Sequence, residues 1–346
     1  MAGGRPWAGI HRGSANGPPT SYGLKYPPVA AALPHPQVMN LVPARPVNHP
    51  RRVVRGARRR GSMSFRRVMI MCRWLAYSGS PVNLEDLLFR PVRSLVMQSK
   101  HSRLGAEEMN GDGFGVGWYS RGPRPGLFHS THPAWNDRNL RELSALAWSE
   151  RVFAHIRAST GSAVQETNCH PFRHERWLWM HNGMISDFPR VKRDLAVAVA
   201  PEFFPLIEGS TDSELFFYLA LTFGLEDDPA PAVATAVGFI EETGRRHGIE
   251  HPVQMTVATT DGDTTWAFRY STEGRSRSLF YSRDVSALRA LHPENPQLQR
   301  LSPDARLVVS EPLGDLEGAW QEVPESTFLA VRGGGIELAP FTPVAA

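Results

Sequence analysis

The chain of 346 residues is 41% hydrophobic and 21% charged, which is the balance of a globular protein with one large domain or two modest ones. It lacks both a run of ~20 apolar residues that would span a membrane and the apolar block of a secretory signal, so we expect a cytoplasmic protein. Its net charge of +4 is unevenly distributed, and its two cysteines are too few for a disulfide framework.

The first predicted segment, residues 1–70, is an extension without a core. It contains eleven Arg, one Lys and no acidic residue, together with ten Pro and eight Gly, and it shows no sustained apolar period. This composition predicts disorder. Gly, Ala, Pro and Arg fill 37 of its 70 positions, which favours a mis-assigned start in GC-rich DNA or a removed segment. The alternative is an organelle-targeting or nucleic-acid-binding arm.

The rest of the chain, residues 71–346, has the opposite charge balance and a different texture. Of the 38 basic residues twelve lie in the extension, and the remaining 26 accompany 34 acidic residues, a net charge of −8. This balance argues against nucleic-acid binding by the folded part. Short β-rich runs predict strands at residues 73–77, 114–119, 152–157, 177–181, 253–259, 265–270, 306–310 and 328–331, with a hairpin at Asp261-Gly262-Asp263. Amphipathic patterns predict helices at residues 139–148, 187–199, 211–223 and 232–246, and strands and helices in blocks indicate an α+β fold.

Cys72 is the first candidate for chemistry. It directly follows Met71, so translation from Met71 and removal of that methionine would make it the first residue. The pKa of a free α-amine, ~7.7 to 8, lies close to the ~8.5 of a thiol, so the amine of the same residue could take the thiol proton. The alternative interpretation is a buried structural cysteine.

Six segments together resemble the class II glutamine amidotransferases, the family of N-terminal-nucleophile (Ntn) hydrolases with an N-terminal cysteine. The order and spacing agree over roughly 145 residues, and weaker similarity continues from Ser310-Glu311-Pro312 to Trp320. The segments are Cys72-Arg73-Trp74-Leu75, the glycine-rich run Asn110 to Gly117, Ala154-His155-Ile156-Arg157-Ala158-Ser159-Thr160, the pair Asn168-Cys169-His170-Pro171 and His181-Asn182-Gly183, and Ser210-Thr211-Asp212-Ser213-Glu214.

The resemblance implies a role for each matching residue. Cys72 would be the nucleophile, and the amide of Asn182 with the backbone N–H of Gly183 would form the oxyanion hole. Arg157 and Thr160 would bind the α-carboxylate of a glutamyl group, Asp212 its ammonium, and His170 would join the substrate-binding set. Taken singly, Arg157 could be a strand-edge charge, Asn182-Gly183 a turn and Asp212 a helix N-cap, but the linked set favours a site.

Other readings of these motifs are weaker. Gly111, Gly113, Gly115 and Gly117 suggest a dinucleotide loop, yet no helix start or ribose-binding acid follows, so close packing of a buried strand is favoured. Six histidines fall between residues 129 and 181, but neither His-Glu-x-x-His nor Cys-x-x-Cys spacing occurs, so we expect no catalytic metal and no cofactor. Cys169 is either a buried thiol or an oxidative partner of Cys72.

The resemblance implies that residues 71–346 form one four-layer αββα Ntn-hydrolase sandwich of two mainly antiparallel sheets flanked by helices. The implied activity is hydrolysis of the γ-glutamyl amide bond of a γ-glutamyl compound through a thioester on Cys72. The closest motifs are those of stand-alone members of the family, which act on γ-glutamyl compounds. Two alternatives remain open: a glutaminase subunit that passes ammonia to a separate synthase partner, and a non-catalytic γ-glutamyl-binding protein in which the preceding residues block Cys72.

Overall fold

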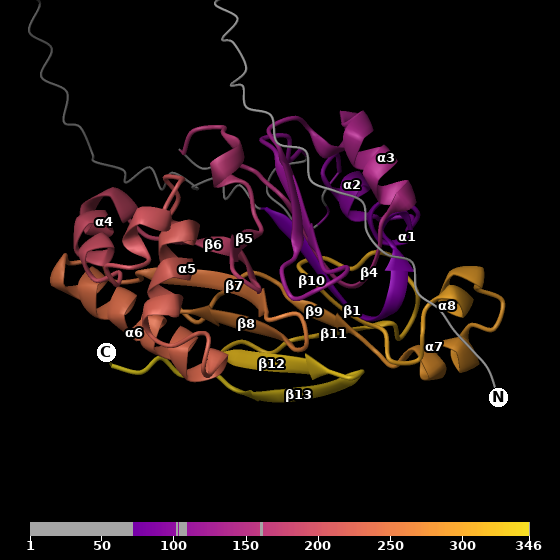
Figure 1. Ribbon diagram of the computed structural model, residues 1–346. Helices are drawn as coiled ribbons and strands as arrows, with labels where there is room; N and C mark the ends of the chain where they lie inside the picture. The colour runs from indigo at the N-terminus through magenta and orange to yellow at the C-terminus, as the bar shows by residue number, and fades with distance from the viewer. Residues whose placement is uncertain (1–71, 102, 104–108, 160–161, 346) are drawn as a thin grey trace, which may run out of the picture. The chain divides into compact units, whose positions relative to one another are not determined.

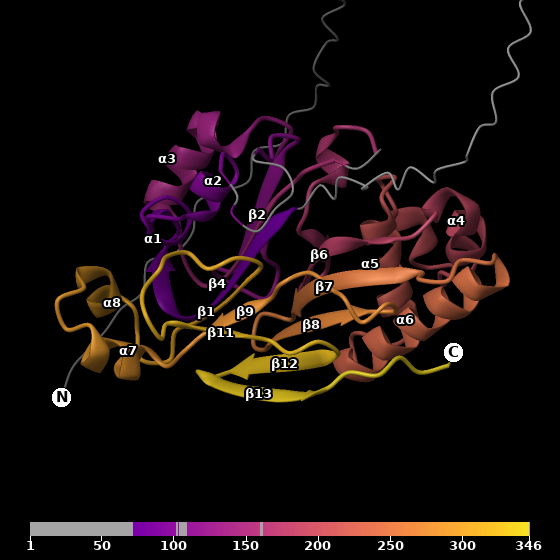
Figure 2. The ribbon, with the colours of Figure 1, turned by 180° about the vertical axis from the view of Figure 1, so that it is seen from behind.

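Two antiparallel sheets dominate the computed structural model, which describes residues 72–101, 103, 109–159 and 162–345 (Figure 1). The first sheet has seven strands in the order β11-β9-β10-β1-β4-β2-β3, and the second has six in the order β13-β12-β8-β7-β6-β5. Figure 2 shows β7, β8, β12 and β13 side by side in the second sheet. The predicted extension, residues 1–70, and Thr160 lie outside the described residues.

The predicted strands are confirmed, with small shifts at their ends. The strands are β1 (Arg73–Asn83), β2 (Phe114–Trp118), β3 (Gly126–Ser130), β4 (Trp148–Ile156), β5 (Phe172–His174), β6 (Trp177–Ile185), β7 (Val253–Thr260), β8 (Thr265–Ser271), β9 (Phe280–Ser282), β10 (Arg306–Val309), β11 (Trp320–Glu322), β12 (Thr327–Arg332) and β13 (Gly335–Pro340). The hairpin predicted at Asp261-Gly262-Asp263 joins β7 to β8, and Gly262 there has a φ of +94°, which favours glycine.

The four predicted helices are also present. The helices are α1 (Leu84–Leu88), α2 (Leu95–Gln98), α3 (Arg138–Leu146), α4 (Phe188–Val197), α5 (Asp212–Thr222), α6 (Pro229–Arg246), α7 (Val285–Leu291) and α8 (Pro296–Arg300), and short 3₁₀ turns lie at Ala134–Asn136, Glu166–Asn168 and Phe204–Leu206. The prediction that the helix at 139–148 includes Trp148 is wrong, because Trp148 pairs with Asn83 and opens β4. None of the helices in the described ranges is long and apolar enough to cross a membrane.

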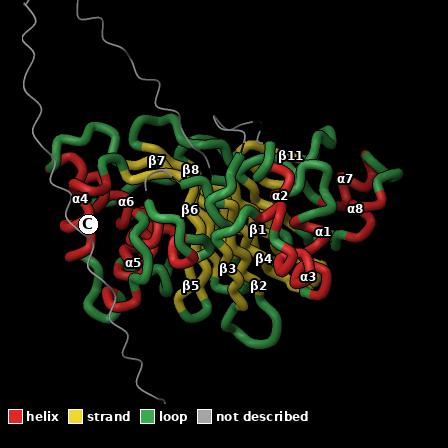
Figure 3. The backbone as a smooth tube through the Cα atoms, turned by 90° about the horizontal axis from the view of Figure 1, so that it is seen from above, coloured by secondary structure: helices red, strands yellow, loops and turns green. Residues whose placement is uncertain are grey.

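Both faces of each sheet are buried, and the side chains of one strand alternate between the two packed layers. Successive side chains of a strand point to opposite faces. In β1, Trp74 and Ala76 join the apolar layer between the two sheets, whereas Leu75 and Tyr77 pack with residues of α1 and α2 on the outer face. The outer face of the second sheet is covered in the same way by α4, α5 and α6. Figure 3 shows the strands lying between these two groups of helices, which confirms the predicted four layers.

Two features of this architecture position the site. Helix α5 is buried on nearly all sides, and its N-cap Thr211 accepts a hydrogen bond from the backbone N–H of Glu214 at 3.2 Å. The two sheets are also joined by hydrogen bonds, because the indole Nε1 of Trp74 donates to Oγ1 of Thr256 at 3.2 Å, and this hydroxyl donates to the carbonyl of Asn182 at 3.4 Å. The first strand of one sheet is thereby linked to the strand that carries Asn182 in the other.

Candidate active site

Cys72 lies half-buried immediately before β1, where β1 pairs with β4. Its Sγ accepts a hydrogen bond from the backbone N–H of Ala158 at 3.4 Å and lies 3.5 Å from the carbonyl oxygen of the same residue. The predicted nucleophile is thus held against the segment that follows β4. Cys72 and Cys169 are both free.

Opposing effects act on the pKa of the Cys72 thiol. Burial raises the pKa and is the dominant influence, while the backbone N–H of Ala158 and the charges of Arg277, Arg157 and Arg73 lower it. The net effect is a raised pKa, so the thiol is neutral at neutral pH and needs a base to become a nucleophile. The positive charges of these three guanidinium groups would stabilise the thiolate that forms when the proton leaves.

Asn182 and Gly183 come from β6, in the opposite sheet. The Nδ2 of Asn182 donates a hydrogen bond to the carbonyl oxygen of Cys72 at 3.0 Å, so the structure brings the predicted oxyanion donor to the nucleophilic residue. A Cβ at Gly183 would lie 1.9 Å from the carbonyl oxygen of Gln254 and 2.5 Å from Nε2 of His181. Only glycine fits at this point of β6.

Asn182→Ala is expected to lower kcat on the order of 10² to 10³-fold, the effect of losing one oxyanion donor. Substrate binding and alkylation of Cys72 by iodoacetamide should persist, since Asn182 contacts the main chain of Cys72 and not its sulfur. Steady-state kinetics and alkylation rates measured together check this. A variant with parental kcat would remove Asn182 from the oxyanion hole.

Arg157 follows β4 and is buried, and its guanidinium holds the loop beyond it. It donates to the carbonyl of Asp112 at 3.2 Å, to the hydroxyls of Ser159 and Ser162 at 3.3 and 2.7 Å, and to the carbonyl of Ala163 at 3.1 Å. Most of these partners are neutral groups that a carboxylate could replace with stronger, charge-assisted hydrogen bonds.

Arg157→Lys keeps the charge but is expected to raise KM for γ-glutamyl substrates strongly, because one ammonium cannot form the two parallel hydrogen bonds that a planar guanidinium donates to a carboxylate. The measurement is kcat/KM beside the rate of Cys72 alkylation, which should stay near the parental rate. Parental kcat/KM with normal alkylation would show that Arg157 does not hold the substrate carboxylate.

Asp212 opens α5 and fixes the end of β6. Its Oδ2 accepts from the backbone N–H of Ile185 at 2.8 Å, and its Oδ1 accepts from the backbone N–H of Ser213 at 2.8 Å. The alternative that Asp212 is the N-cap is wrong, because Thr211 holds that position. Asp212 therefore ties the helix start to the strand that carries Asn182 and Gly183, and its ammonium-binding role stays a prediction.

Asn168 and His170, from the Asn-x-His-Pro segment, have different surroundings. Asn168 joins two loops: its Nδ2 donates to the carbonyl of Ala163 at 2.8 Å, and its Oδ1 accepts from the backbone N–H of Ser210 at 2.8 Å. His170 shares a hydrogen bond with His155, Nδ1 to Nε2 at 2.9 Å, and packs edge-on against Phe172. Its predicted part in substrate binding remains a prediction.

The buried histidines resist protonation. Burial lowers the pKa of His155 to about 3 and that of His129 to about 4, and it lowers the pKa of His170 and of His181 as well. Among the described residues no three His, Cys, Asp or Glu side chains are grouped so as to hold a metal ion. His155, His170 and His181 are thus neutral imidazoles in the core, and His129 is a neutral imidazole that is only partly buried.

Acid should therefore destabilise the fold. Below a pH of about 6.5, His155 and His129 become protonated in the unfolded chain but stay neutral in the folded chain. The free energy of unfolding therefore falls as the pH drops toward the pKa values of the folded state. At about pH 5 each costs about 2 kcal/mol relative to about pH 7.5. His129→Gln is the matched control, since its amide can still donate to the carbonyl of Pro171, to which Nε2 of His129 donates at 3.1 Å. Denaturant unfolding at both pH values should show a smaller loss in this variant, and an equal loss would contradict the assignment.

Cys169 packs closely against the glycine-rich segment. Cys169 is fully buried, and burial raises the pKa of its thiol to about 11. A Cβ at Gly113 would lie 2.8 Å from its sulfur, and one at Gly115 would lie 2.2 Å from the carbonyl oxygen of His170. The prediction that these glycines serve close packing of a buried strand is confirmed for Gly115 and Gly117, which lie in β2, whereas Gly111 and Gly113 precede the strand and Gly113 has a φ of +107°. Oxidative pairing of Cys169 with Cys72 stays a prediction.

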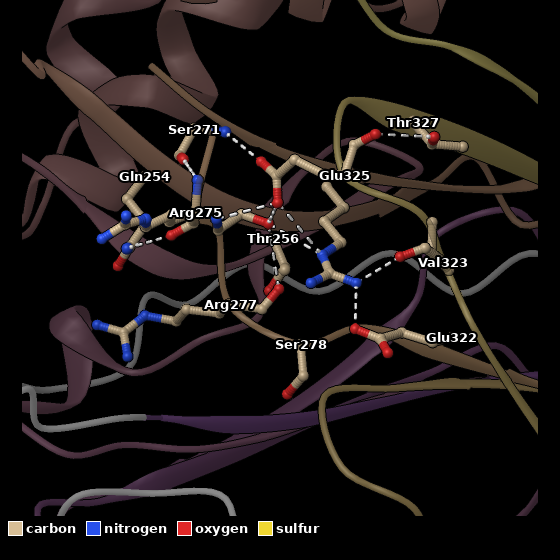
Figure 4. A network of polar contacts seen from close by, with 12 residues as sticks. Gln254, Thr256, Ser271, Arg275, Arg277, Ser278, Glu322, Val323, Glu325 and Thr327 are labelled. Carbon is tan, nitrogen blue, oxygen red and sulfur yellow. Dashed lines mark hydrogen bonds and ion pairs between the residues drawn. The ribbon is translucent and has the colours of Figure 1, made fainter. Parts of the chain in front are cut away.

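Three charged residues near Cys72 were not predicted as site residues. Arg73 is the first residue of β1, Glu311 follows β10, and Arg277 lies in the loop between β8 and β9; all three are buried. In Figure 4 the side chain of Arg277 extends away from the network around Glu322, Val323 and Glu325. A signal for Arg73 was present in the sequence, because a charged residue begins a strand that is otherwise apolar as far as Tyr77.

A separate cavity of about 400 Å³ lies beside α1, α7 and α8. Its lining includes Leu87, Leu288, Leu298 and Trp320 but none of the predicted site residues. It is therefore separate from the predicted site.

The fold agrees with the comparisons with known proteins. The profile of the family "Glutamine amidotransferases class-II" matches residues 90–344, and the chain belongs to this family.

Relatives place the chain more narrowly within that family. It is 36% identical over 301 residues to the "Probable glutamine amidotransferase DUG3" of Saccharomyces cerevisiae, covering 78% of this chain and 84% of that protein. It is 26% identical over 272 residues to the gamma-glutamyl-hercynylcysteine sulfoxide hydrolase of Mycolicibacterium smegmatis, covering 78% of this chain and all of that protein. A solved class-II domain protein from Silicibacter pomeroyi superposes with a TM-score of 0.60 at 34% identity, covering 79% of this chain and all of the other.

A more distant structure shows the fold alone. The glutamine phosphoribosylpyrophosphate amidotransferase of B. subtilis superposes with a TM-score of 0.54 at 15% identity. The match covers 79% of this chain but only 50% of that protein. The common part is thus about half of the larger enzyme.

Proposed function

We propose that this chain hydrolyses the γ-glutamyl amide bond of a γ-glutamyl compound, with Cys72 as the nucleophile. The observation that carries the proposal is the meeting of two sheets at Cys72, where the thiol lies against Ala158 and the amide of Asn182 reaches the carbonyl of the same residue. This contact supports the proposed pairing of a nucleophile with an oxyanion donor.

The reaction runs in two steps. The thiol gives up its proton to a base, Sγ attacks the γ-carbonyl carbon, and the C–N bond breaks as the leaving amine takes the proton. Water then attacks the resulting thioester, which releases glutamate and returns the proton to Sγ. Arg157, Thr160, His170 and Asp212 hold the glutamyl end, and Asn182 with Gly183 stabilises the oxyanion in both steps.

Hydrolysis of a γ-glutamyl compound is favoured over delivery of ammonia to a partner. The relatives that this chain matches along most of their length include a hydrolase whose name specifies a γ-glutamyl substrate. A reducing cytoplasm is the proposed compartment, because it would keep Cys72 reduced.

A panel of leaving groups tests the proposal. The purified protein in the form that begins at Cys72 is incubated with glutamine, glutathione and γ-glutamyl-p-nitroanilide, and released glutamate is measured. The matched control is α-glutamyl-p-nitroanilide, which places the scissile carbonyl at the wrong end of the glutamyl group. We expect glutamate from at least one γ-linked compound and none from the α-linked control. Equal release from both linkages, or release from neither, would refute the proposed function.

A further inference from the structure

Arg73 and Glu311 form a buried ion pair beside the nucleophile. The Nε of Arg73 lies 3.0 Å from Oε2 of Glu311, and the exposed fractions of the two side chains are 1% and 3%. The register of β1 against β10 explains the contact, because Leu75 pairs with Val309 and the same register carried two residues further sets Arg73 opposite Glu311. Directly opposite residues share one face of a sheet.

This face is not the one that carries the nucleophile. Arg73 shares its side of β1 with Leu75 and Tyr77, which pack toward the outer helices, whereas Trp74 packs between the sheets. Because side chains alternate, Arg73 and the thiol of Cys72 project to opposite sides. The guanidinium makes its hydrogen bond to the main chain of this residue: its Nη1 donates to the carbonyl oxygen of Cys72 at 2.9 Å.

The carbonyl of Cys72 consequently has two donors. Arg73 supplies one at 2.9 Å and Asn182 supplies the other at 3.0 Å. If Asn182 is to stabilise an oxyanion on the substrate, its amide has to turn away from this carbonyl. A buried carbonyl left without any donor is unfavourable, so a second donor that stays in place makes that movement easier.

We propose that Arg73 and Glu311 are a positioning pair for the reaction: Glu311 fixes the guanidinium, and the guanidinium retains the Cys72 carbonyl while the amide of Asn182 moves to the oxyanion. The proposal rests on the proposed function in that it gives the pair a part in the same turnover. Arg73 is a positioning residue, which acts through the carbonyl of Cys72 and the amide of Asn182.

Paired substitutions separate positioning from stability. Removing one member of a buried ion pair is strongly destabilising, whereas replacing both by apolar residues of similar volume is often neutral. Arg73→Met and Glu311→Leu are therefore made singly and together. We expect the double variant to recover a melting temperature near that of the parent while its kcat stays roughly 10²-fold low, the size of a misplaced catalytic group. KM should stay near the parental value, because no substrate contact is lost.

A double-mutant cycle with Asn182 gives a readout that a merely structural role would not move. If Arg73 works through Asn182, Asn182→Ala should cost much less in the Arg73→Met chain than in the parent. Arg306→Met is the matched control: Arg306 begins the same strand β10, pairs with Asp284 at 2.9 Å, and should leave kcat unchanged.

A second measurement does not depend on turnover. The full chain contains only two cysteines, so labelling with carbonyl-¹³C cysteine gives one resonance for Cys72 and one for Cys169, which serves as the internal reference. Loss of the donor in Arg73→Met should move the Cys72 resonance upfield and leave that of Cys169 in place.

The outcomes distinguish a failure of this proposal from a failure of the proposed function on which it rests. A parent that releases no glutamate from any γ-linked compound refutes the proposed function, and the carbonyl resonance still decides whether Arg73 holds Cys72. An unmoved Cys72 resonance, a double variant that regains parental kcat, or fully independent effects of Arg73→Met and Asn182→Ala would each overturn the positioning role.

Discussion

Cys72→Ala is expected to abolish turnover of every γ-glutamyl compound and the formation of any γ-glutamyl thioester. The sulfur is the atom that bonds to the substrate carbon, and the contacts around it, from Ala158 to the nearby arginines, stabilise a thiolate and cannot replace it. The measurements are glutamate release and intact mass after a rapid acid quench, which traps the glutamyl adduct on the parent only.

Cys72→Ser is the sharper control for this prediction, because its hydroxyl preserves shape while being a far poorer nucleophile at neutral pH. We expect it to bind substrate with turnover close to that of the alanine variant. Both variants should be compared with the parent by thermal unfolding to show that the fold persists. Near-parental activity of Cys72→Ala on any compound of the panel would mean that another group performs the chemistry.

The active protein is expected to begin at Cys72. Burial raises the pKa of the thiol, so the proton needs an acceptor, and the α-amine of Cys72 is the one that the sequence offers. When the nitrogen is part of a peptide bond this base is lost, and a chain that retains residues 1–71 should be nearly inactive.

Intact-mass analysis of the active fraction checks this expectation directly. The protein is produced once as the full chain and once from Met71 in a host that removes the initiator methionine, and each form is assayed against its measured mass. Activity should follow the free cysteine. A stable and fully active chain that still carries residues 1–71 would contradict the α-amine as the base. An inactive form that starts at Cys72 would favour the γ-glutamyl-binding alternative.

The parts of the structure that could be predicted from sequence are those with a local signal. Strands such as β1 and β7 are apolar runs because both of their faces are buried, and α5 begins at cap-type residues. The short strands β3, β5, β9, β11 and β13 were not predicted, because runs of three to six residues carry little pattern and are defined by their partners; all but β9 lie at a sheet edge.

The same distinction holds for the candidate site. Cys72, Arg157, Asn182 and Asp212 could be named because the family motifs preserve residue types at fixed spacings. The pair of Arg73 and Glu311 could not, since its members are 238 positions apart and meet only through the register of β1 and β10. Similarly, the burial that controls the histidine pKa values depends on packing between layers and not on neighbours in the chain.

The hydrogen bonds from Trp74 through Thr256 to Asn182 have a consequence for efforts to make this protein more heat-resistant. The proposed nucleophile directly precedes a strand of one sheet and the proposed oxyanion donor lies in the other sheet, so we expect a slight slip of the sheets to inactivate the protein while each half stays folded. Strengthening the outer helices would then raise the apparent melting point without prolonging the working life of the catalyst. Selection for longer activity at high temperature should instead favour substitutions in the layer between the sheets, around Trp74 and Thr256, where catalytic geometry and mechanical cohesion depend on the same contacts.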